Sequence, residues 1–164
     1  MATSKILYAP ESAITFKSTG GSAVFTPTSV ANAAGRVSAV YDRGAGSLAA
    51  PLRWQVRTRC GTNPTVGNVL RVYLITGQDG TYEDAAFASG DAAVSSEDSF
   101  RNATLIGQVQ ADAASTTKDF IKSGLVYVYA RYIRVGWWNA LSQALSSTAA
   151  DHEMTLVPMP DEAQ

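Results

Sequence analysis

The chain has 164 residues, which is the length of one ordinary domain. Charged residues make up only 16% and the formal net charge is −1, so no overall basic field draws the chain to nucleic acid or to an anionic membrane. A single cysteine, Cys60, and a single histidine, His152, exclude an intrachain disulfide framework, a CxxC motif and a multi-histidine metal cage. No apolar run reaches the length of a transmembrane helix. These features predict a soluble single domain.

The first residues, 1–12, are predicted to form an N-terminal arm. This arm holds three consecutive apolar residues, Ile6, Leu7 and Tyr8, before a proline. We expect it to add to the edge of a neighbour's sheet or to lie in a groove, and the alternative is that it forms the first strand of the chain's own sandwich. Residues 13–16 and 23–25 follow, separated by a Ser- and Gly-rich turn, and they predict a leading hairpin.

The clearest strand pattern runs over residues 52–60. Apolar and small residues alternate strictly with polar ones, which is typical of a half-buried strand. The predicted inner face carries Leu52, Trp54, Val56, Thr58 and Cys60. The predicted outer face carries Arg53, Gln55, Arg57 and Arg59.

Further strands are predicted down to the C-terminal region, and none of the remaining segments favours a long helix. Residues 69–76 are apolar on both faces apart from Arg71, which is typical of a strand covered on both sides. The other predicted strands span 36–41, 104–109, 125–139 and 152–157, with 125–139 dividing near Ala130–Arg131. Eight or nine short strands predict an all-β antiparallel sandwich over residues 13–158, most simply a jelly roll, with a short acidic tail at 159–164.

One long connection, residues 77–102, is strongly acidic. It contains Asp79, Glu83, Asp84, Asp91, Glu97 and Asp98 against the single Arg101. Residues 52–71, by contrast, carry Arg53, Arg57, Arg59 and Arg71 and no acid. We expect the acidic loop and the arginine row to act in contacts between molecules. The loop lacks the spacing of a calcium-binding loop, so a solvated or partner-facing role is favoured over a cation site.

The residues that could carry catalysis are few. His152 lies between Asp151 and Glu153, but neighbouring residues in a strand face opposite sides, so we interpret it as a histidine near the surface at a strand start. Cys60 is interpreted as a small core residue. There is no G-x-S-x-G motif and no phosphate-binding loop. The sequence therefore predicts no catalytic residue, no metal and no cofactor.

Trp137 and Trp138 form the most distinctive dipeptide. Because consecutive strand residues face opposite ways, one indole is expected in the core and the other on the outer face. An outer indole, with Tyr129 or Tyr132, would fill a protein interface or stack on a sugar ring. The alternative is that both sheet faces are covered and both indoles lie in the core.

The chain resembles small virion proteins of tailed bacteriophages over about residues 70–162. The resemblance is carried by segments such as Val72-Tyr73-Leu74, Gly90-Asp91-Ala92-Ala93-Val94, Arg101-Asn102-Ala103-Thr104 and Trp137-Trp138-Asn139. It implies a β-sandwich or jelly-roll capsid decoration (cement) protein that binds the outer shell of the major capsid protein as a homo-oligomer, dimer or trimer. It carries no catalytic residues.

The function expected from the resemblance is therefore structural. We expect a non-enzymatic protein of the virion, assembled in the bacterial cytoplasm, without nucleic acid or membrane as partner. The expected interface residues are Ile6, Leu7, Tyr8, Arg53, Arg57, Arg59, Asp79, Glu83, Asp84, Trp137 and Trp138. Two alternatives stay open: a head–tail or tail-fibre adaptor, and a carbohydrate-binding jelly roll for host attachment.

Overall fold

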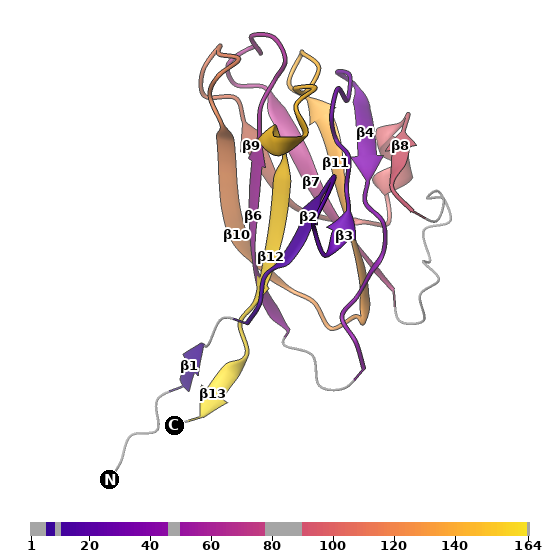
Figure 1. Cartoon of the computed structure of the whole chain (residues 1–164), viewed down its shortest axis with the longest axis vertical. Helices are drawn as coiled ribbons and strands as arrows, with labels where there is room; N and C mark the ends of the chain where they lie inside the picture. The colour runs from indigo at the N-terminus through magenta and orange to yellow at the C-terminus, as the bar shows by residue number, and fades with distance from the viewer. Residues whose placement is uncertain (1–5, 9–10, 46–49, 78–89, 164) are drawn as a thin grey trace.

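The computed structural model describes residues 6–8, 11–45, 50–77 and 90–163, and these residues confirm an all-β fold. Two sheets pack face to face as a sandwich, and a third sheet of two strands projects from one end (Figure 1). The described chain has two short 3-10 helices, η1 (Glu97–Phe100) and η2 (Ala149–Asp151). Among the described residues there is no helix with the length and apolar character needed to cross a membrane.

The first sheet has the strand order β10–β6–β12–β2–β3. Its strands are β10 (Phe120–Tyr127), β6 (Pro51–Thr58), β12 (Glu153–Pro158), β2 (Ile14–Lys17) and β3 (Ala23–Val24). The predicted leading hairpin is wrong, because β3 pairs with β2 in parallel. The chain after Lys17 first returns beside β2, where the Ser22 N–H donates to the Thr15 carbonyl, and only then enters β3.

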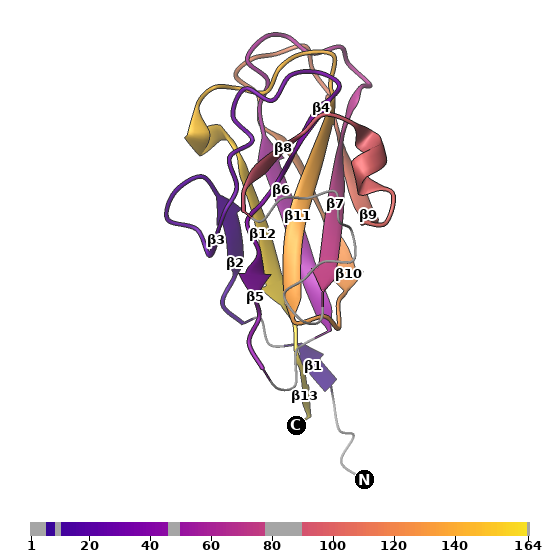
Figure 2. The same cartoon turned by 90° about the vertical axis from the view of Figure 1, so that its right-hand side faces the viewer.

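The second sheet has the strand order β8–β4–β11–β7–β9, with β5 also paired to β11. Its strands are β8 (Ala92–Val94), β4 (Ala34–Val37), β11 (Tyr132–Ala140), β7 (Val69–Gly77), β9 (Thr104–Gln110) and β5 (Tyr41–Asp42). Figure 2 shows this sheet from its outer side. The predicted division near Ala130–Arg131 is confirmed, since β10 ends and β11 begins on either side of it.

The main core lies between the two sheets. The alternation predicted for residues 52–60 is confirmed, because Leu52, Trp54, Val56, Thr58 and Cys60 are all buried. Facing them across the sandwich are buried residues of the second sheet, among them Leu70, Val72, Val135 and Trp137. Burial of apolar side chains at about 25 cal/mol per Å² is the main source of stability for such a core.

Trp54 depends on two glycines for its place in this core. A Cβ built on Gly107 of β9 would come within 2.5 Å of the indole, and one on Gly124 of β10 within 2.7 Å. β9 and β10 are edge strands of the two sheets. The missing side chains on both edges therefore make room for the largest residue of β6.

A second, smaller core lies on the outer side of the second sheet. It consists of Val37, Tyr73, Ile75, Val94, Phe100 and Trp138. Residues 91–103, which include β8 and η1, form a cover over β4, β11 and β7, and we call this segment the cover. The prediction that residues 69–76 are buried on both faces is confirmed, because Leu74 belongs to the main core and Tyr73 to the second.

The long connection over 77–102 is therefore not one extended loop. Its second half forms β8 and η1, and residues 78–89, with Asp79, Glu83 and Asp84, lie outside the described residues. The described chain contains thirteen strands, against the eight or nine predicted. The additional strands have only two or three residues each, too few for an alternation pattern to be visible in the sequence.

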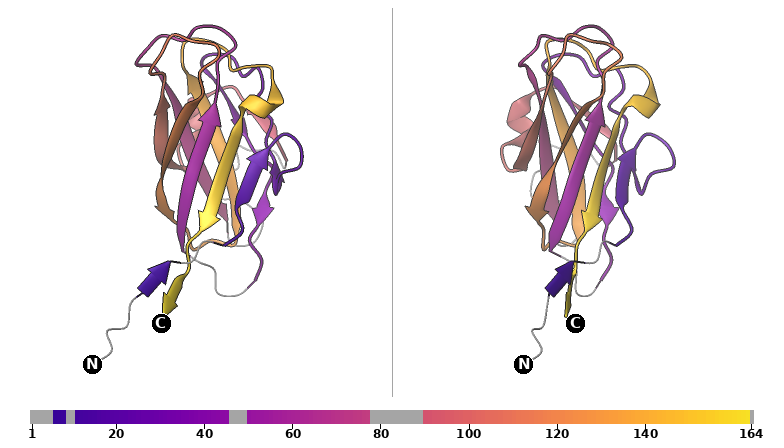
Figure 3. Two further views of the ribbon diagram at one scale, coloured as in Figure 1. Left: turned by 60° about the vertical axis from the view of Figure 1, so that its left-hand side comes forward. Right: turned by 90° about the vertical axis from the view of Figure 1, so that its left-hand side faces the viewer.

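The two ends of the described chain pair with each other away from the sandwich. β1 (Ile6–Tyr8) is antiparallel to β13 (Asp161–Ala163), with Leu7 opposite Glu162. We call this pair the terminal ribbon, and both views of Figure 3 show it extending from one end of the sandwich. Residues 6–8 of the predicted arm thus pair with residues 161–163 of the predicted tail.

Candidate interface surface

The outer faces of the two sheets differ in what covers them. The second sheet carries the cover, whereas the outer face of β10, β6 and β12 stays open within the described chain. Ile121, Leu125 and Tyr127 of β10 point outward there and are 56%, 56% and 61% exposed. Because exposed large apolar side chains that cluster on one face mark interaction surfaces, this face is the candidate site.

The register across the three strands defines rows on this face. Ile121 aligns with Arg57 and Glu153, and Ser123 aligns with Gln55 and Thr155. Toward the terminal ribbon, Leu125 aligns with Arg53 and Val157, and Tyr127 then aligns with Pro51. The face therefore changes from charged at its far end to apolar at the end that carries the ribbon.

The charged end is held together within the chain. The Arg59 guanidinium donates to Asp119 and also lies 3.3 Å from a carboxylate oxygen of Asp151. Arg57 donates to the Ala150 carbonyl at 2.6 Å and lies 3.9 Å from Asp119. The hydrogen bond that Arg59 donates to the Asp119 carboxylate raises the pKa of the Arg59 guanidinium. Residues 52–71 hold no acid, as the sequence shows, and the acids that pair with Arg57 and Arg59 come from other segments that fold beside β6.

Arg71 and two residues of the predicted acidic loop also form pairs within the chain. Arg71 donates to both carboxylate oxygens of Glu97 at 2.8 and 2.7 Å, and the Tyr73 hydroxyl donates to Glu97 at 2.6 Å. Burial and this carboxylate together raise the pKa of Tyr73 to about 12. Asp91 receives two hydrogen bonds from Arg36, at 2.8 and 2.7 Å. These bonds fasten the cover to β4 and β7.

The apolar end of the open face is hollowed. Two hollows of about 450 and 350 Å³ lie side by side, and Arg53 and Met159 line both of them. We call the two together the outer groove. Its main lining residues are Pro51, Arg53, Leu125, Tyr127, Val157 and Met159.

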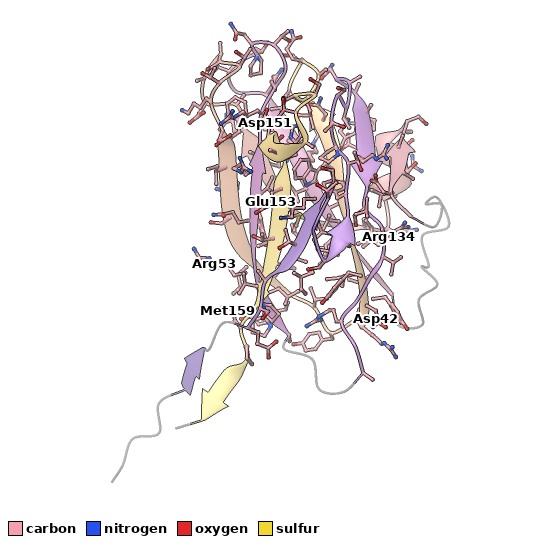
Figure 4. All side chains as sticks on the ribbon, viewed as in Figure 1. Asp42, Arg53, Arg134, Asp151, Glu153 and Met159 are labelled. Atoms are coloured by element: carbon pink, nitrogen blue, oxygen red, sulfur yellow. The ribbon has the colours of Figure 1, made fainter. Side chains whose placement is uncertain are left out.

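Arg53 is the charge in this groove. Its neighbours across the sheet are Leu125 and Val157, and it forms no ion pair with the side chains of residues 11–45, 50–77 and 90–160. Figure 4 shows the side chain reaching away from β6, with Met159 nearer the ribbon. A cation surrounded by apolar surface fits a partner segment that combines apolar and acidic residues.

His152 is buried, and the prediction that it lies near the surface is wrong. Its Nε2 lies 2.8 Å from the Ser146 carbonyl and its Nδ1 lies 2.9 Å from the Thr58 hydroxyl. Because a carbonyl only accepts, Nε2 carries the proton and Nδ1 accepts from Thr58 in the neutral ring. Burial lowers the pKa of His152, so the ring is held in this neutral form.

The remaining chemically reactive candidates are also enclosed. Cys60 is buried as predicted, and burial raises the pKa of its thiol to about 11, so the reactive thiolate is disfavoured. In the part of the chain that the structure describes, no three residues of the types His, Cys, Asp and Glu gather as they would to hold a metal ion.

The two tryptophans of the dipeptide face opposite sides, as predicted, but neither is exposed. Trp137 lies in the main core and is 1% exposed, and Trp138 lies under the cover and is 7% exposed. The expectation of an exposed outer indole is wrong, because Phe100 and Val94 of the cover pack on that side. Neither indole forms part of the open surface.

The outer groove was missed by the sequence analysis, although one signal for it exists. Outward and inward residues alternate along β10, and the outward ones are Ile121, Ser123, Leu125 and Tyr127. This alternation could have identified Leu125 and Tyr127 as an outward apolar pair near the end of the strand. The contributions of Pro51, Val157 and Met159 could not, because they reach the groove only through strand pairing. Of the predicted interface residues, Arg53 lies in this groove and Ile6, Leu7 and Tyr8 form β1 of the ribbon at the same end.

Comparisons were made with protein-family models, with curated proteins and with solved structures, and nothing in any of the three matches this chain.

Proposed function

We propose that the sandwich is a jelly roll. Eight strands support this reading: β2, β4, β6, β7, β9, β10, β11 and β12. In chain order the first of them pairs with the last through β2–β12, and the third with the sixth through β6–β10. The second pairs with the seventh through β4–β11, and the fourth with the fifth through β7–β9. This nested pairing is what a long hairpin gives when it rolls into two sheets.

We propose further that the protein is a non-enzymatic virion protein of a tailed bacteriophage, which binds the outside of the capsid shell as a homo-oligomer and stabilises it. One observation carries this proposal: an open sheet face ends in an apolar groove beside a ribbon that projects from the body. Apolar hollows next to projecting segments are typical of proteins that assemble with others. The resemblance over residues 70–162 adds the capsid as the place of assembly.

The energetics of this surface fit many weak contacts. Exposed ion pairs contribute about 0–1 kcal/mol each, so affinity must come from the apolar groove and ribbon. An oligomer on a repeating shell engages several sites at once, and this raises its overall binding strength without any new contact.

The number of copies per particle tests the proposal. Quantitative mass spectrometry of purified virions of the encoding phage, scaled to the major capsid protein, should find hundreds of copies. Twelve copies or fewer would favour the head–tail or tail-fibre adaptor, and absence from the particle would overturn a virion function altogether. Loss of the protein from the particle should also lower the temperature at which the shells release DNA.

The carbohydrate-binding alternative has less support from the structure than from the sequence. It required an exposed tryptophan, and Trp54, Trp137 and Trp138 are all buried. No other observation in the described chain favours it over assembly on a capsid.

A further inference from the structure

We propose that the outer groove of one molecule receives the terminal ribbon of a second copy of this chain. This inference rests on the proposed function for the expectation of a homo-oligomer, and it deepens that function by naming the contact between copies. The ribbon needs a partner surface, its composition matches the groove, and it is directed away from its own groove.

The ribbon is too small to be stable by itself. It consists of three residue pairs, Ile6–Ala163, Leu7–Glu162 and Tyr8–Asp161, and it forms a separate sheet that projects from the end of the sandwich (Figure 1). Isolated two-stranded sheets are at best marginally stable in water, and three or more strands or a packing surface are needed. A second molecule supplies such a surface.

The composition of the ribbon complements that of the groove. β1 is apolar throughout, and β13 brings two acids, Asp161 and Glu162. The groove offers exposed Leu125 and Tyr127 together with Arg53, whose aligned neighbours on β10 and β12 are the apolar residues Leu125 and Val157. Apolar contact would supply affinity, while the opposite charges would select the partner and its orientation.

The chain leaves the sandwich in a direction that favours a second molecule over its own groove. Met159 lines the groove, and only Pro160 separates it from Asp161, where β13 begins. Met159 itself stands between Pro158 and Pro160, and a residue before a proline is restricted to extended conformations. A reversal onto the same molecule would require a tight turn within this extended segment, whereas a straight exit carries the ribbon outward, as Figure 1 shows.

Paired substitutions on β10 test the groove. Leu125 and Ile121 lie on the same outer face and are both 56% exposed, but only Leu125 lines the groove. The native chain should sediment as a multiple of 17.3 kDa at micromolar concentration. Leu125→Asp should raise the dissociation constant of the oligomer by about tenfold or more, while the matched control Ile121→Asp leaves it unchanged. A native monomer, or equal effects of the two variants, would overturn the inference.

A charge exchange tests the pairing of Arg53 with the ribbon. Arg53→Glu alone and the double change Asp161→Lys with Glu162→Lys alone should each weaken the oligomer, and the triple variant should recover it at least in part. Arg53 lies on the open face, and residues 161 and 162 belong to the ribbon, so none of the three positions is in the sandwich core. The melting temperature of each variant should therefore stay near that of the native chain. Failure of the triple variant to recover association would contradict direct contact between these charges.

Cross-linking distinguishes exchange between molecules from folding back. Leu7→Cys in a tagged chain and Leu125→Cys in an untagged chain are mixed and treated with a short bis-maleimide; the native Cys60 is buried. A tagged–untagged product supports exchange. Absence of this product overturns the inference. In a chain that carries both Leu7→Cys and Leu125→Cys, an intrachain link formed in place of interchain links also overturns it.

Binding of the monomeric Leu125→Asp variant to capsids separates the two proposals. If this variant no longer forms the oligomer but still binds particles, the proposed function and the role of the groove in the oligomer both stand. If the protein is absent from particles but the native chain forms an oligomer through the ribbon, this inference stands and the proposed function is wrong.

Discussion

His152 is a buried titratable residue that joins separate segments of the fold through both ring nitrogens. Its neutral ring joins Thr58 of β6 to the Ser146 carbonyl before η2, and its edge packs against Trp137 at 6.3 Å between ring centroids. Burial lowers the pKa of His152 in the folded chain, whereas the unfolded chain keeps the ordinary value of 6.5. At His152, the unfolded chain therefore binds more protons than the folded chain between the lowered folded pKa and 6.5.

We predict that the stability contributed by neutral His152 is fully present above pH 6.5 and is lost as the pH falls from 6.5 toward the lowered folded pKa. In this window the unfolded chain takes up a proton that the folded chain does not, and the slope of the unfolding free energy reaches at most about 1.4 kcal/mol per pH unit. Urea unfolding at several pH values between 5 and 8 measures this slope.

The variant His152→Gln provides the control for this prediction, because its amide can donate to Ser146 and accept from Thr58 without titrating. The slope between pH 6.5 and 5 should disappear in this variant, even if its stability at pH 8 is lower. The lowered pKa values of Asp42 and Asp91 keep those carboxylates charged throughout this window. An unchanged slope in His152→Gln would assign the pH response to other groups.

At the scale of elements, the cover decides which outer sheet face is available. Phe100 of η1 stacks on Tyr73 of β7 with ring centroids 4.5 Å apart, and it occupies space left by glycines of β11 and β4. A Cβ on Gly136 would overlap the Phe100 ring, and one on Gly35 would come within 3.2 Å of it. The cover thus fits closely over β4, β11 and β7, so this part of the second sheet's outer face is not open to partners.

We predict that Phe100→Ala loosens the cover and leaves the main core in place. Removal of a buried phenylalanine costs about 3–5 kcal/mol where the site cannot collapse, and the cover can respond by opening locally. Amide exchange over residues 91–103 should become at least tenfold faster, and tryptophan emission should shift to the red because Trp138 meets water.

Phe100→Leu is the matched variant for this prediction, because it retains most of the apolar volume. It should show a much smaller change in exchange and emission. If exchange in Phe100→Ala instead rises equally in β6 and β12, the cover is an integral part of the global fold and not a separable element.

At the scale of the whole molecule, the last two strands, β12 before Met159 and β13 after it, play different roles. β12 lies between β6 and β2 in the first sheet, so without it β2 and β3 have no hydrogen-bonded connection to β6 and β10. β13 pairs only with β1, outside the sandwich. The last strand of the sandwich and the terminal ribbon are therefore adjacent in sequence but separate in structure.

We predict that a chain ending at Met159 folds with a melting temperature within about 3 °C of the native value, since a loss below about 1 kcal/mol shifts the melting temperature by only 2–4 °C in a domain of this size. A chain ending at Asp151 lacks β12 and should show no cooperative unfolding. Differential scanning calorimetry compares the two. Cooperative unfolding of the shorter chain would contradict the central place of β12.

Much of the candidate site was beyond reach from the sequence because it depends on which strands become neighbours. Alternation along residues 52–60 was sufficient to place Arg53, Arg57 and Arg59 on one outer face. It could not show that Asp119 and Asp151 come beside Arg59 while the residues aligned with Arg53 are Leu125 and Val157. That difference follows from the register of β10 and β12 against β6, which brings together residues about 60 to 100 positions apart.

The sequence by itself determined the all-β class, the inward and outward faces of β6, the two-sided burial of β7 and the opposite directions of Trp137 and Trp138. Each of these follows from the period-two geometry of a strand, which is a local property of the backbone. Only the tertiary structure decided that the cover buries Trp138, that His152 is enclosed, that β2 and β3 run parallel, and that the open face ends in a groove beside the ribbon. Those features depend on contacts between distant segments, and no pattern within one segment encodes them.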